Sequence, residues 1–267
     1  MAGAAVAALA VWQLVDGSDK SDADGVTTTA ALQSAPQRAE ASEPEPESAA
    51  DPVESRRGDR RLALDVPRDA YPVIWVRRGA KVEVRTAPGG GEVAKRVGRE
   101  TEFGSPTVFG VVRESGGWAG VTAPFLPNNQ LGWIRLDSRR LSGGWTKRSV
   151  VVDLSERRAV LRNGDEVAMS FSVSIGMPGS ETPTGRFAVT DTFRGNLNPA
   201  YGCCAVALSA NQPHLPSGWL GGSRIAIHGT SGPLGVAASH GCVRAADPNV
   251  NALVNKMPLG APVFIRG

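Results

Sequence analysis

The chain has 267 residues, of which 41% are hydrophobic, and it contains 32 glycines, 19 prolines and three cysteines. Its length allows one or two domains, and its composition excludes a multi-span membrane protein, a collagen-like fibre and a wholly disordered chain. The net charge of +3 has two unlike parts, because two basic and ten acidic residues before Arg56 give −8 and the rest of the chain gives +11. A basic body could suit a nucleic-acid partner, but no nucleic-acid-binding motif accompanies it, so we expect none.

Residues 1–15 form an apolar segment in which Gln13 is the one polar side chain between Ala2 and Val15. A bilayer span needs about 20 apolar residues, whereas this length fits the apolar part of a signal peptide or a signal anchor, without the basic residues that usually precede it. We therefore predict an extracytoplasmic protein of the cell envelope, either secreted or tethered to the membrane through its N-terminus. The alternative is an alanine-rich helix without a targeting role.

Residues 16–66 are rich in Ser, Ala, Pro, Asp and Glu, with EPEPE at 43–47, and hold few large apolar side chains. Such a segment buries too little surface to offset the entropy of ordering it. We predict a disordered acidic linker that gives the rest of the chain reach.

A small all-β barrel is predicted over residues 67–142. Short apolar runs are broken by Gly and Pro, Val82 and Val84 alternate with polar residues, and glycines cluster at 89–91 and 116–117, where tight turns fit. The stretches VEVRTAPGGGEV, GGWAGV and LGWI make this region resemble the bacterial SH3-like domains of exported wall proteins. The resemblance leaves open whether the module binds the wall or only spaces a second domain.

A second β-rich region is predicted over residues 146–267. Asn163-Gly164 is a two-residue hairpin signal because both residue types tolerate positive φ, and Val167 then begins an apolar and small-residue alternation that runs to Ile175. One helix is expected before Pro258, with Asp247 as its cap. The other strands are indicated at 149–154, 185–193, 204–209, 224–229 and 261–267. We therefore expect a mainly β protein with one or two short helices.

The chemistry concentrates in RIAIHGTSGPLGVAASHGCVR, residues 224–244. His228 ends an apolar strand, and Cys242 follows a loop rich in Gly and Ala. A free cysteine with a pKa of about 8.5 is mostly protonated at neutral pH, so attack on an amide carbonyl needs an imidazole that takes the proton and later gives it to the leaving amine. Because His240 shares a tight turn with Cys242, we predict that it points elsewhere and that His228 is the base.

The turn around Cys242 also predicts an oxyanion site. Ser239 and Gly241 are small enough to let the backbone fold closely, so that the amides of Gly241 and Cys242 point at one spot. The backbone of His240 belongs to the same turn, and a direct catalytic role for its side chain stays open.

IHGT followed by SHGCVR, with ETPTGRF at 181–187, resembles the catalytic signature of the YkuD-type L,D-transpeptidases, which cross-link peptidoglycan. The resemblance covers residues 146–267 and implies a β-sandwich catalytic domain. It implies that Cys242 is the nucleophile and that His228 is the proton donor and acceptor. The backbone carbonyl of Gly229 would orient the imidazole ring, and His240 and Gly241 would belong to the oxyanion site.

The resemblance implies acyl transfer without a metal or a cofactor. The cysteine attacks the bond between the third residue of a tetrapeptide donor stem, usually a diamino acid, and its terminal D-Ala, which leaves from a thioester. The side-chain amine of a second stem's diamino acid then resolves the thioester, and if water does so instead, the enzyme is an L,D-carboxypeptidase. The family also implies acylation of the cysteine by carbapenems but not by most penicillins.

Three further positions are expected to contact the substrate. Arg244 would bind the carboxylate of the stem or support the loop, Tyr201 would line the acceptor side, and Ser239 would lie in the binding site. For Tyr201 the alternative is an edge aromatic that caps the core.

Cys203 and Cys204 are adjacent, and neighbours cannot easily present both thiolates to one tetrahedral ion. We therefore predict no metal site at this pair. We also predict no disulfide between them, with the two side chains on opposite faces of the strand that follows.

Other functions stay open. Attachment of a protein to peptidoglycan would use the same site, whereas a non-catalytic wall-binding protein would not need Cys242. A papain-like endopeptidase is disfavoured because its cysteine precedes its histidine, whereas here His228 comes first.

Overall fold

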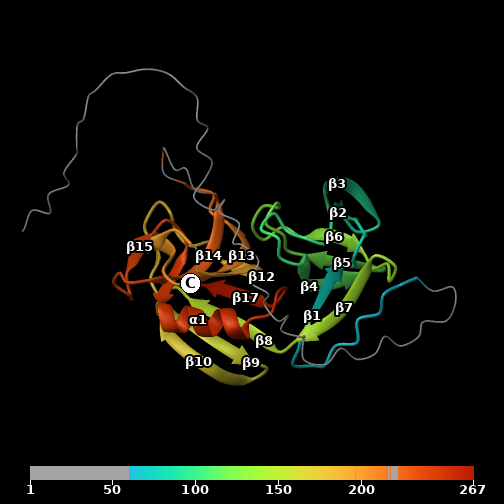
Figure 1. Ribbon diagram of the computed structural model, residues 1–267. Helices are drawn as coiled ribbons and strands as arrows, with labels where there is room; N and C mark the ends of the chain where they lie inside the picture. The colour runs from blue at the N-terminus through green and yellow to red at the C-terminus, as the bar shows by residue number, and fades with distance from the viewer. Residues whose placement is uncertain (1–59, 196, 216, 218–221) are drawn as a thin grey trace, which may run out of the picture.

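The computed structural model describes residues 60–195, 197–215, 217 and 222–267, and the chain is mainly β (Figure 1). The predicted signal segment at 1–15 and residues 16–59 of the predicted linker lie outside these residues. Two large sheets stand side by side and are joined where the last strand of the first leads into the first strand of the second. In the described part of the chain, no helix is long and apolar enough to cross a membrane.

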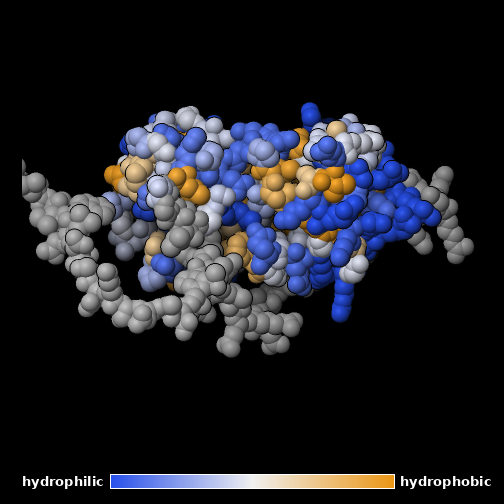
Figure 2. Space-filling model, turned by 90° about the horizontal axis from the view of Figure 1, so that it is seen from above, coloured by the Kyte–Doolittle hydropathy of each residue, from blue (hydrophilic) through white to orange (hydrophobic). Residues whose placement is uncertain are grey.

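The first sheet belongs to an N-terminal module, residues 60–146. Its seven strands are β1 (Tyr71–Val76), β2 (Val82–Ala87), β3 (Gly90–Val97), β4 (Val108–Ser115), β5 (Trp118–Val121), β6 (Gly132–Arg135) and β7 (Leu141–Thr146). They pair in the order β3-β2-β6-β5-β4-β1-β7 around a core that includes Ile74, Val84, Ile134 and Leu141. In Figure 2 the surface on the side of this module is largely hydrophilic, apart from a hydrophobic patch toward the middle of the molecule. Its likeness to SH3-like domains stays a prediction.

The predicted linker ends earlier than residue 66. The N–H of Leu62 donates to the carbonyl of Leu136 at 3.1 Å, and Leu62 and Leu64 pack against the core of the module. A Cβ on Gly143 would lie 2.4 Å from Leu64 Cδ2. Two alternating leucines, together with the backbone pairing of Arg60 and Arg61 with Ser138 and Asp137, thus hold this segment on the module although its composition is polar.

The second sheet belongs to a C-terminal domain, residues 147–267. Its eight strands are β8 (Arg148–Asp153), β9 (Arg158–Asn163), β10 (Glu166–Ser172), β12 (Gly185–Arg194), β13 (Cys204–Asn211), β14 (Arg224–Thr230), β16 (Val243–Ala246) and β17 (Pro262–Arg266). Their order is β10-β9-β8-β17-β12-β13-β14-β16, and β11 (Ile175–Gly176) pairs with β15 (Ala237–Ser239) in a separate sheet. The predicted sandwich therefore takes the form of one large sheet around a single core.

One α-helix, α1 (Asp247–Lys256), covers the core side of the second sheet, and a short 3₁₀ helix, η1 (Pro199–Tyr201), precedes β13. Val250 and Leu253 of α1 are fully buried in the same core as Val206 and Ile227. Because successive side chains of a strand point to opposite faces, the neighbours of Ile227 on β14 face away from the helix. This places His228 on the other face of the sheet.

Three local predictions are wrong in detail. Asn163 pairs with Glu166, so the hairpin loop is Gly164-Asp165, and a two-residue loop of type II′ requires positive φ at its first position, where Gly164 has φ 58°. The alternation from Val167 breaks because the register shifts before Met169, which leaves Val167 59% exposed on the edge strand. Asp247 does not cap α1, since the cap position is Ala246 and no side chain bonds there.

The N-terminal module packs directly on the C-terminal domain. A Cβ on Gly110 would lie 2.5 Å from the carbonyl oxygen of Gly260, so the two backbones touch. The N–H of Asn211 donates to Asn128 Oδ1 at 2.9 Å, and Asn128 Nδ2 donates back to the Asn211 carbonyl at 2.6 Å. Close backbone contact and reciprocal side-chain bonds fix the module against β12 and β13.

Candidate active site

Parallel pairing of β14 and β16 brings His228 and Cys242 onto neighbouring strands. Ile227 pairs with Val243 and His228 pairs with Arg244, so Cys242, directly before β16, lies beside Ala226. A backbone hydrogen bond from Ala226 to the Cys242 sulfur agrees with this placement. No direct hydrogen bond joins the imidazole of His228 to the thiol among the described residues.

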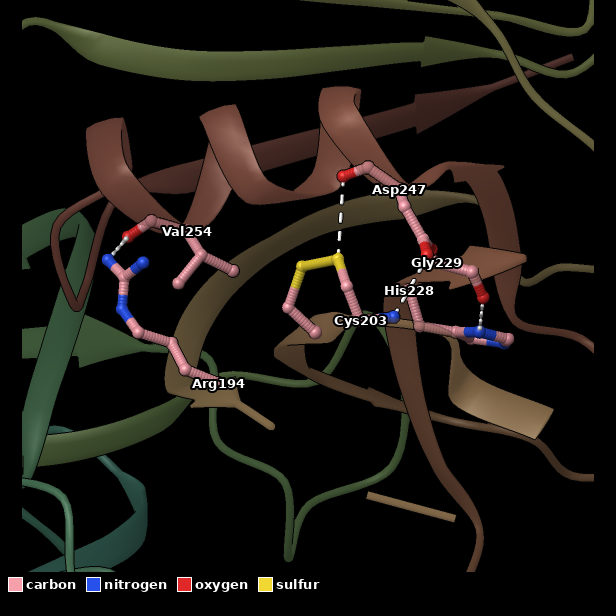
Figure 3. Close-up of a disulfide and its surroundings, with 7 residues drawn as sticks. Arg194, Cys203, His228, Gly229, Asp247 and Val254 are labelled. Atoms are coloured by element: carbon pink, nitrogen blue, oxygen red, sulfur yellow. Dashed lines mark hydrogen bonds between the residues drawn. A yellow bond between two sulfur atoms is a disulfide. The ribbon is translucent and has the colours of Figure 1, made fainter. Parts of the chain in front are cut away.

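The ring of His228 is held in one orientation. Its Nδ1 lies 2.8 Å from the carbonyl oxygen of Gly229 (Figure 3), and the ring of Tyr201 stands edge-on to it with 5.0 Å between ring centres. Because a carbonyl only accepts hydrogen bonds, Nδ1 carries the proton of the neutral ring and Nε2 keeps its lone pair. The imidazole is therefore oriented as a base.

Burial keeps both candidate groups neutral. Desolvation lowers the pKa of His228 from 6.5 to about 4, with the nearby charge of Arg244 acting in the same direction and backbone hydrogen bonds of Gly229 and Tyr201 opposing it. Burial also raises the pKa of the Cys242 thiol, although the Ala226 backbone and Arg244 work against this. At neutral pH the resting pair is thus a thiol and an unprotonated imidazole, and the proton moves only as the sulfur attacks.

The Arg244 guanidinium lies close enough to influence both groups. Its Nη1 donates to the carbonyl of Ala238 at 3.3 Å, and its Nε is buried without a hydrogen-bond partner among the described residues. A buried donor of this kind can receive a carboxylate. The structure thus leaves both of the predicted roles available to Arg244, anion binding and support of the loop.

Ser239 shapes the turn that carries Cys242. Its side chain is fully buried, and its hydroxyl donates to the Cys242 carbonyl at 2.5 Å and accepts the N–H of Gly241 at 3.2 Å. Substrate contact by Ser239 stays a prediction, and its burial and its two hydrogen bonds within the turn give it a structural role there. The same bond occupies the N–H of Gly241, so an oxyanion role for that amide requires the bond to open.

Position 241 requires a glycine. Its φ is +109°, and a Cβ there would lie 2.2 Å from Gln212 Nε2, which is both a backbone and a packing requirement for glycine. Gln212 Nε2 also donates to the carbonyls of Glu181 at 3.0 Å and His240 at 3.3 Å. The predicted oxyanion residues are thus held by a side chain that the sequence did not single out.

Thr182 is a second positioning residue that was not predicted as a site residue. Its buried hydroxyl accepts the N–H of Gly176 at 2.9 Å and donates to the carbonyl of Gly241 at 2.8 Å. The signal for it was present in the TPTG segment, which carried the family resemblance without a stated role. Thr182 joins that segment to the cysteine turn.

Replacing Thr182 by valine should lower the free energy of unfolding by about 2 kcal/mol, because one buried N–H and one buried carbonyl lose their partner. The same change should slow acylation of Cys242, since the turn is no longer held. Chemical denaturation measures the first effect and intact-protein mass against time the second. Thr184→Val is the matched control, since Thr184 is exposed in the same segment, and equal losses in the two variants would contradict the role of Thr182.

Cys203 and Cys204 form a disulfide (Figure 3), which corrects the prediction for this pair. The predicted alternation fails because β13 begins at Cys204, while Cys203 still belongs to the turn before it. The N–H of Cys203 donates to Asp247 Oδ1 at 3.2 Å, so the carboxylate expected to cap α1 holds this turn instead. A Cβ on Gly229 would lie 2.1 Å from the same oxygen, which places Asp247 directly behind the carbonyl that orients His228.

The domain that carries this site is similar to a known protein family. Residues 147–265 match YkuD, the L,D-transpeptidase catalytic domain. The YkuD domain spans the second sheet, α1 and both members of the Cys242–His228 pair. The resemblance read from IHGT and SHGCVR is thereby confirmed at the level of the domain.

Curated relatives and solved structures resemble the YkuD domain at moderate similarity. The proteins called "Putative L,D-transpeptidase YkuD" in Bacillus subtilis (strain 168) and Bacillus licheniformis are each 28% identical over 118 residues, which is 43% of this chain and 64% of theirs. The chain therefore spans less than two thirds of these relatives. Among solved structures, an L,D-transpeptidase from Xylanimonas cellulosilytica is 26% identical with a TM-score of 0.34, covering 45% of this chain and 60% of that one. An L,D-transpeptidase from Mycobacterium smegmatis is 12% identical with a TM-score of 0.40, and the match covers 74% of this chain and 99% of that one.

Proposed function

We propose that the protein is a peptidoglycan L,D-transpeptidase that cross-links stem peptides through a thioester on Cys242. The observation that supports the proposal is that Cys242 and the oriented imidazole of His228 come from neighbouring segments of a YkuD domain, Cys242 directly before β16 and His228 on the β14 strand that pairs with it. A wall-binding protein without catalysis would need neither the fixed ring nor the glycine at 241. The proposed reaction uses no cofactor.

In the first half of the reaction, Nε2 of His228 takes the proton of Cys242 as Sγ attacks the carbonyl carbon between the third residue and D-Ala. The amide of Cys242, and that of Gly241 once its bond to Ser239 has opened, receive the negative charge of the tetrahedral oxygen. When the carbon–nitrogen bond breaks, His228 gives its proton to the amine of D-Ala. The products are free D-Ala and a thioester on Cys242.

In the second half, the side-chain amine of an acceptor diamino acid attacks the thioester carbonyl. His228 accepts the proton of the attacking amine, and the sulfur leaves and is protonated again. A new amide joins the two stems and the enzyme returns to its neutral resting pair. Arg244 supplies a cation for a carboxylate of a stem, and Tyr201 lines the path beside the imidazole.

The proposal includes an extracytoplasmic place of action in the cell envelope. Peptidoglycan stems are found outside the cytoplasm, which agrees with the export segment predicted from the sequence at residues 1–15. The basic balance of the residues after Arg56 favours an approach to an anionic wall. In this reading the N-terminal module is an SH3-like companion of the catalytic domain.

Product mass distinguishes this function from those that share the site. The purified protein is incubated with a tetrapeptide-stem fragment, and the products are weighed. We expect a dimer that has lost one D-Ala. A tripeptide alone would indicate an L,D-carboxypeptidase, a cut at another bond an endopeptidase, and an unchanged stem would contradict catalysis. Attachment of a protein to the wall would appear only when a protein amine is supplied as acceptor.

A further inference from the structure

A pocket lies beside the candidate nucleophile, where the two parts of the chain meet. Its floor is made of alanines of β13 and β14, and its walls are aromatic. One floor residue is Ala226, whose backbone bonds the Cys242 sulfur. One wall belongs to the N-terminal module, because Phe103 lies in the loop between β3 and β4. The residues that line the pocket include Phe103, Phe193, Ala226 and Arg224.

The loop that carries Phe103 is fixed on the catalytic domain. Thr101 Oγ1 donates to Asp191 Oδ1 and accepts the N–H of Phe103 at 3.3 Å. The ring of Phe103 stands edge-on to that of Phe193, with 5.3 Å between ring centres. The wall is therefore a built part of the pocket, in keeping with the close packing of the module on β12 and β13.

The far end of the pocket carries a surplus of negative charge. Arg224 donates to Glu102 through Nη2 and lies 3.6 Å from Asp191 through Nη1, so two carboxylates face one guanidinium. Asp191 is fully buried, whereas the Glu102 side chain is 53% exposed. Only Oε1 of Glu102 meets Arg224, and its second oxygen can accept a further hydrogen bond from a ligand.

The two ends of the site differ in charge: the end near Arg244 favours an anionic group of a ligand, and the end near Glu102 and Asp191 favours a cationic one. Arg244 pairs with His228 at one end, and Arg224 with its two carboxylates lies four residues earlier on β14. A strand rises about 3.3 Å per residue, so the acidic end is about 7 Å along the strand from Ala226 and the thiol. A ligand that reaches from the thiol over the alanines passes apolar surface first and meets a carboxylate last. An aliphatic chain with a terminal ammonium has this order of properties.

We propose that the pocket binds the side chain of the third residue of the donor stem, with its methylenes on Phe103 and Phe193 and its terminal ammonium on Glu102. This inference rests on the proposed transpeptidase function. It makes Glu102, a residue of the N-terminal module, a specificity-determining residue of the reaction. The module then serves the active site directly and does more than space it from the linker.

The test compares two tetrapeptide stems with the full-length protein. One stem has a free side-chain amine on its third residue, and in the other that amine is acetylated, which removes the charge and keeps the methylenes. D-Ala released in the first turnover is measured against stem concentration, so that the later fate of the thioester does not enter. The wild type should favour the free amine by about tenfold, as expected for one charge-assisted hydrogen bond.

Glu102→Gln should remove this preference. The variant should lose about tenfold with the free-amine stem, chiefly as a higher half-saturating concentration, and should match the wild type with the acetylated stem. Glu100→Gln is the matched control, since Glu100 is an exposed carboxylate of the same loop, and it should keep the wild-type preference. Phe103→Ala should weaken both stems equally, because the wall is lost for both.

The outcomes separate this inference from the function on which it rests. Carbapenem acylation should proceed at the wild-type rate in Glu100→Gln, since Glu100 does not line the pocket, and an adduct should still form in Glu102→Gln, which verifies that its Cys242 is reactive. If D-Ala is released but Glu102→Gln keeps the preference, or Glu100→Gln loses it too, the pocket assignment is wrong and the function stands. If the wild type neither releases D-Ala nor is acylated, both proposals are wrong.

Discussion

His228→Gln should slow acylation of Cys242 by about 10²- to 10⁴-fold, the usual contribution of a positioned general base. Burial raises the pKa of the Cys242 thiol, so the nucleophile depends on a base that removes its proton during the attack. Glutamine fills a similar volume without a titrating nitrogen. The measurement is the rate at which a carbapenem adduct appears in the intact-protein mass.

Two further variants serve as controls for this experiment. Cys242→Ala should form no adduct, and an adduct that persists in it would refute the nucleophile assignment. His214→Gln should react like the wild type, because His214 is exposed and only its backbone takes part in the hydrogen bonds to Gln212 and Ser180. If His228→Gln reacted at the wild-type rate, the base would have to be another group.

The pH dependence of the wild-type rate tests the neutral pair. Because the pKa of His228 is lowered to about 4, the acid limb should fall near pH 4 and not near 6.5, the usual value. Because the thiol pKa is raised, the rate should stay flat through neutral pH. A rate that climbs with pH across the ordinary thiol range would instead indicate attack by a preformed thiolate.

The strands that frame the site could be predicted because their signals are local. The strand predictions at 185–193, 204–209 and 224–229 agree with β12, β13 and β14, since each of these strands contains a short apolar run of its own. The pair of His228 and Cys242 could be found for a similar reason, since both lie in one short motif. Adjacent parallel strands then bring the motif's two ends together.

The predictions that failed depended on partners far away in the chain. Asp247 has the composition of a helix cap, yet its carboxylate bonds the N–H of Cys203, 44 residues earlier. A propensity rule describes what a residue does without tertiary competition. For the same reason no local pattern predicts that Gln212 bonds the carbonyl of His240 or that Glu102 reaches Arg224, since the first contact needs the folded C-terminal domain and the second needs the module packed on it.

Acidification should destabilise the fold through His228, and this is the second large effect. The folded-state pKa of about 4 lies below the usual 6.5, so between these values the unfolded chain binds a proton that the folded chain refuses. The stabilisation is complete above pH 6.5 and is lost as pH falls toward 4. At about 1.4 kcal/mol per pKa unit, the loss is about 3 kcal/mol.

The physical reason for this loss is the closed surroundings of the ring. Its exposed fraction is 3%, with Tyr201 edge-on against it and Arg244 paired beside it, so a second positive charge has neither water nor a carboxylate to meet. The measurement is the free energy of unfolding in urea at pH 7 and at pH 4.5 for the wild type and His228→Gln. Carboxylates common to both chains cancel in the difference, and His214→Gln should retain the wild-type slope. If the two chains lost equal stability on acidification, the imidazole would not be held neutral in the fold, and the base assigned to the reaction would start from the wrong protonation state.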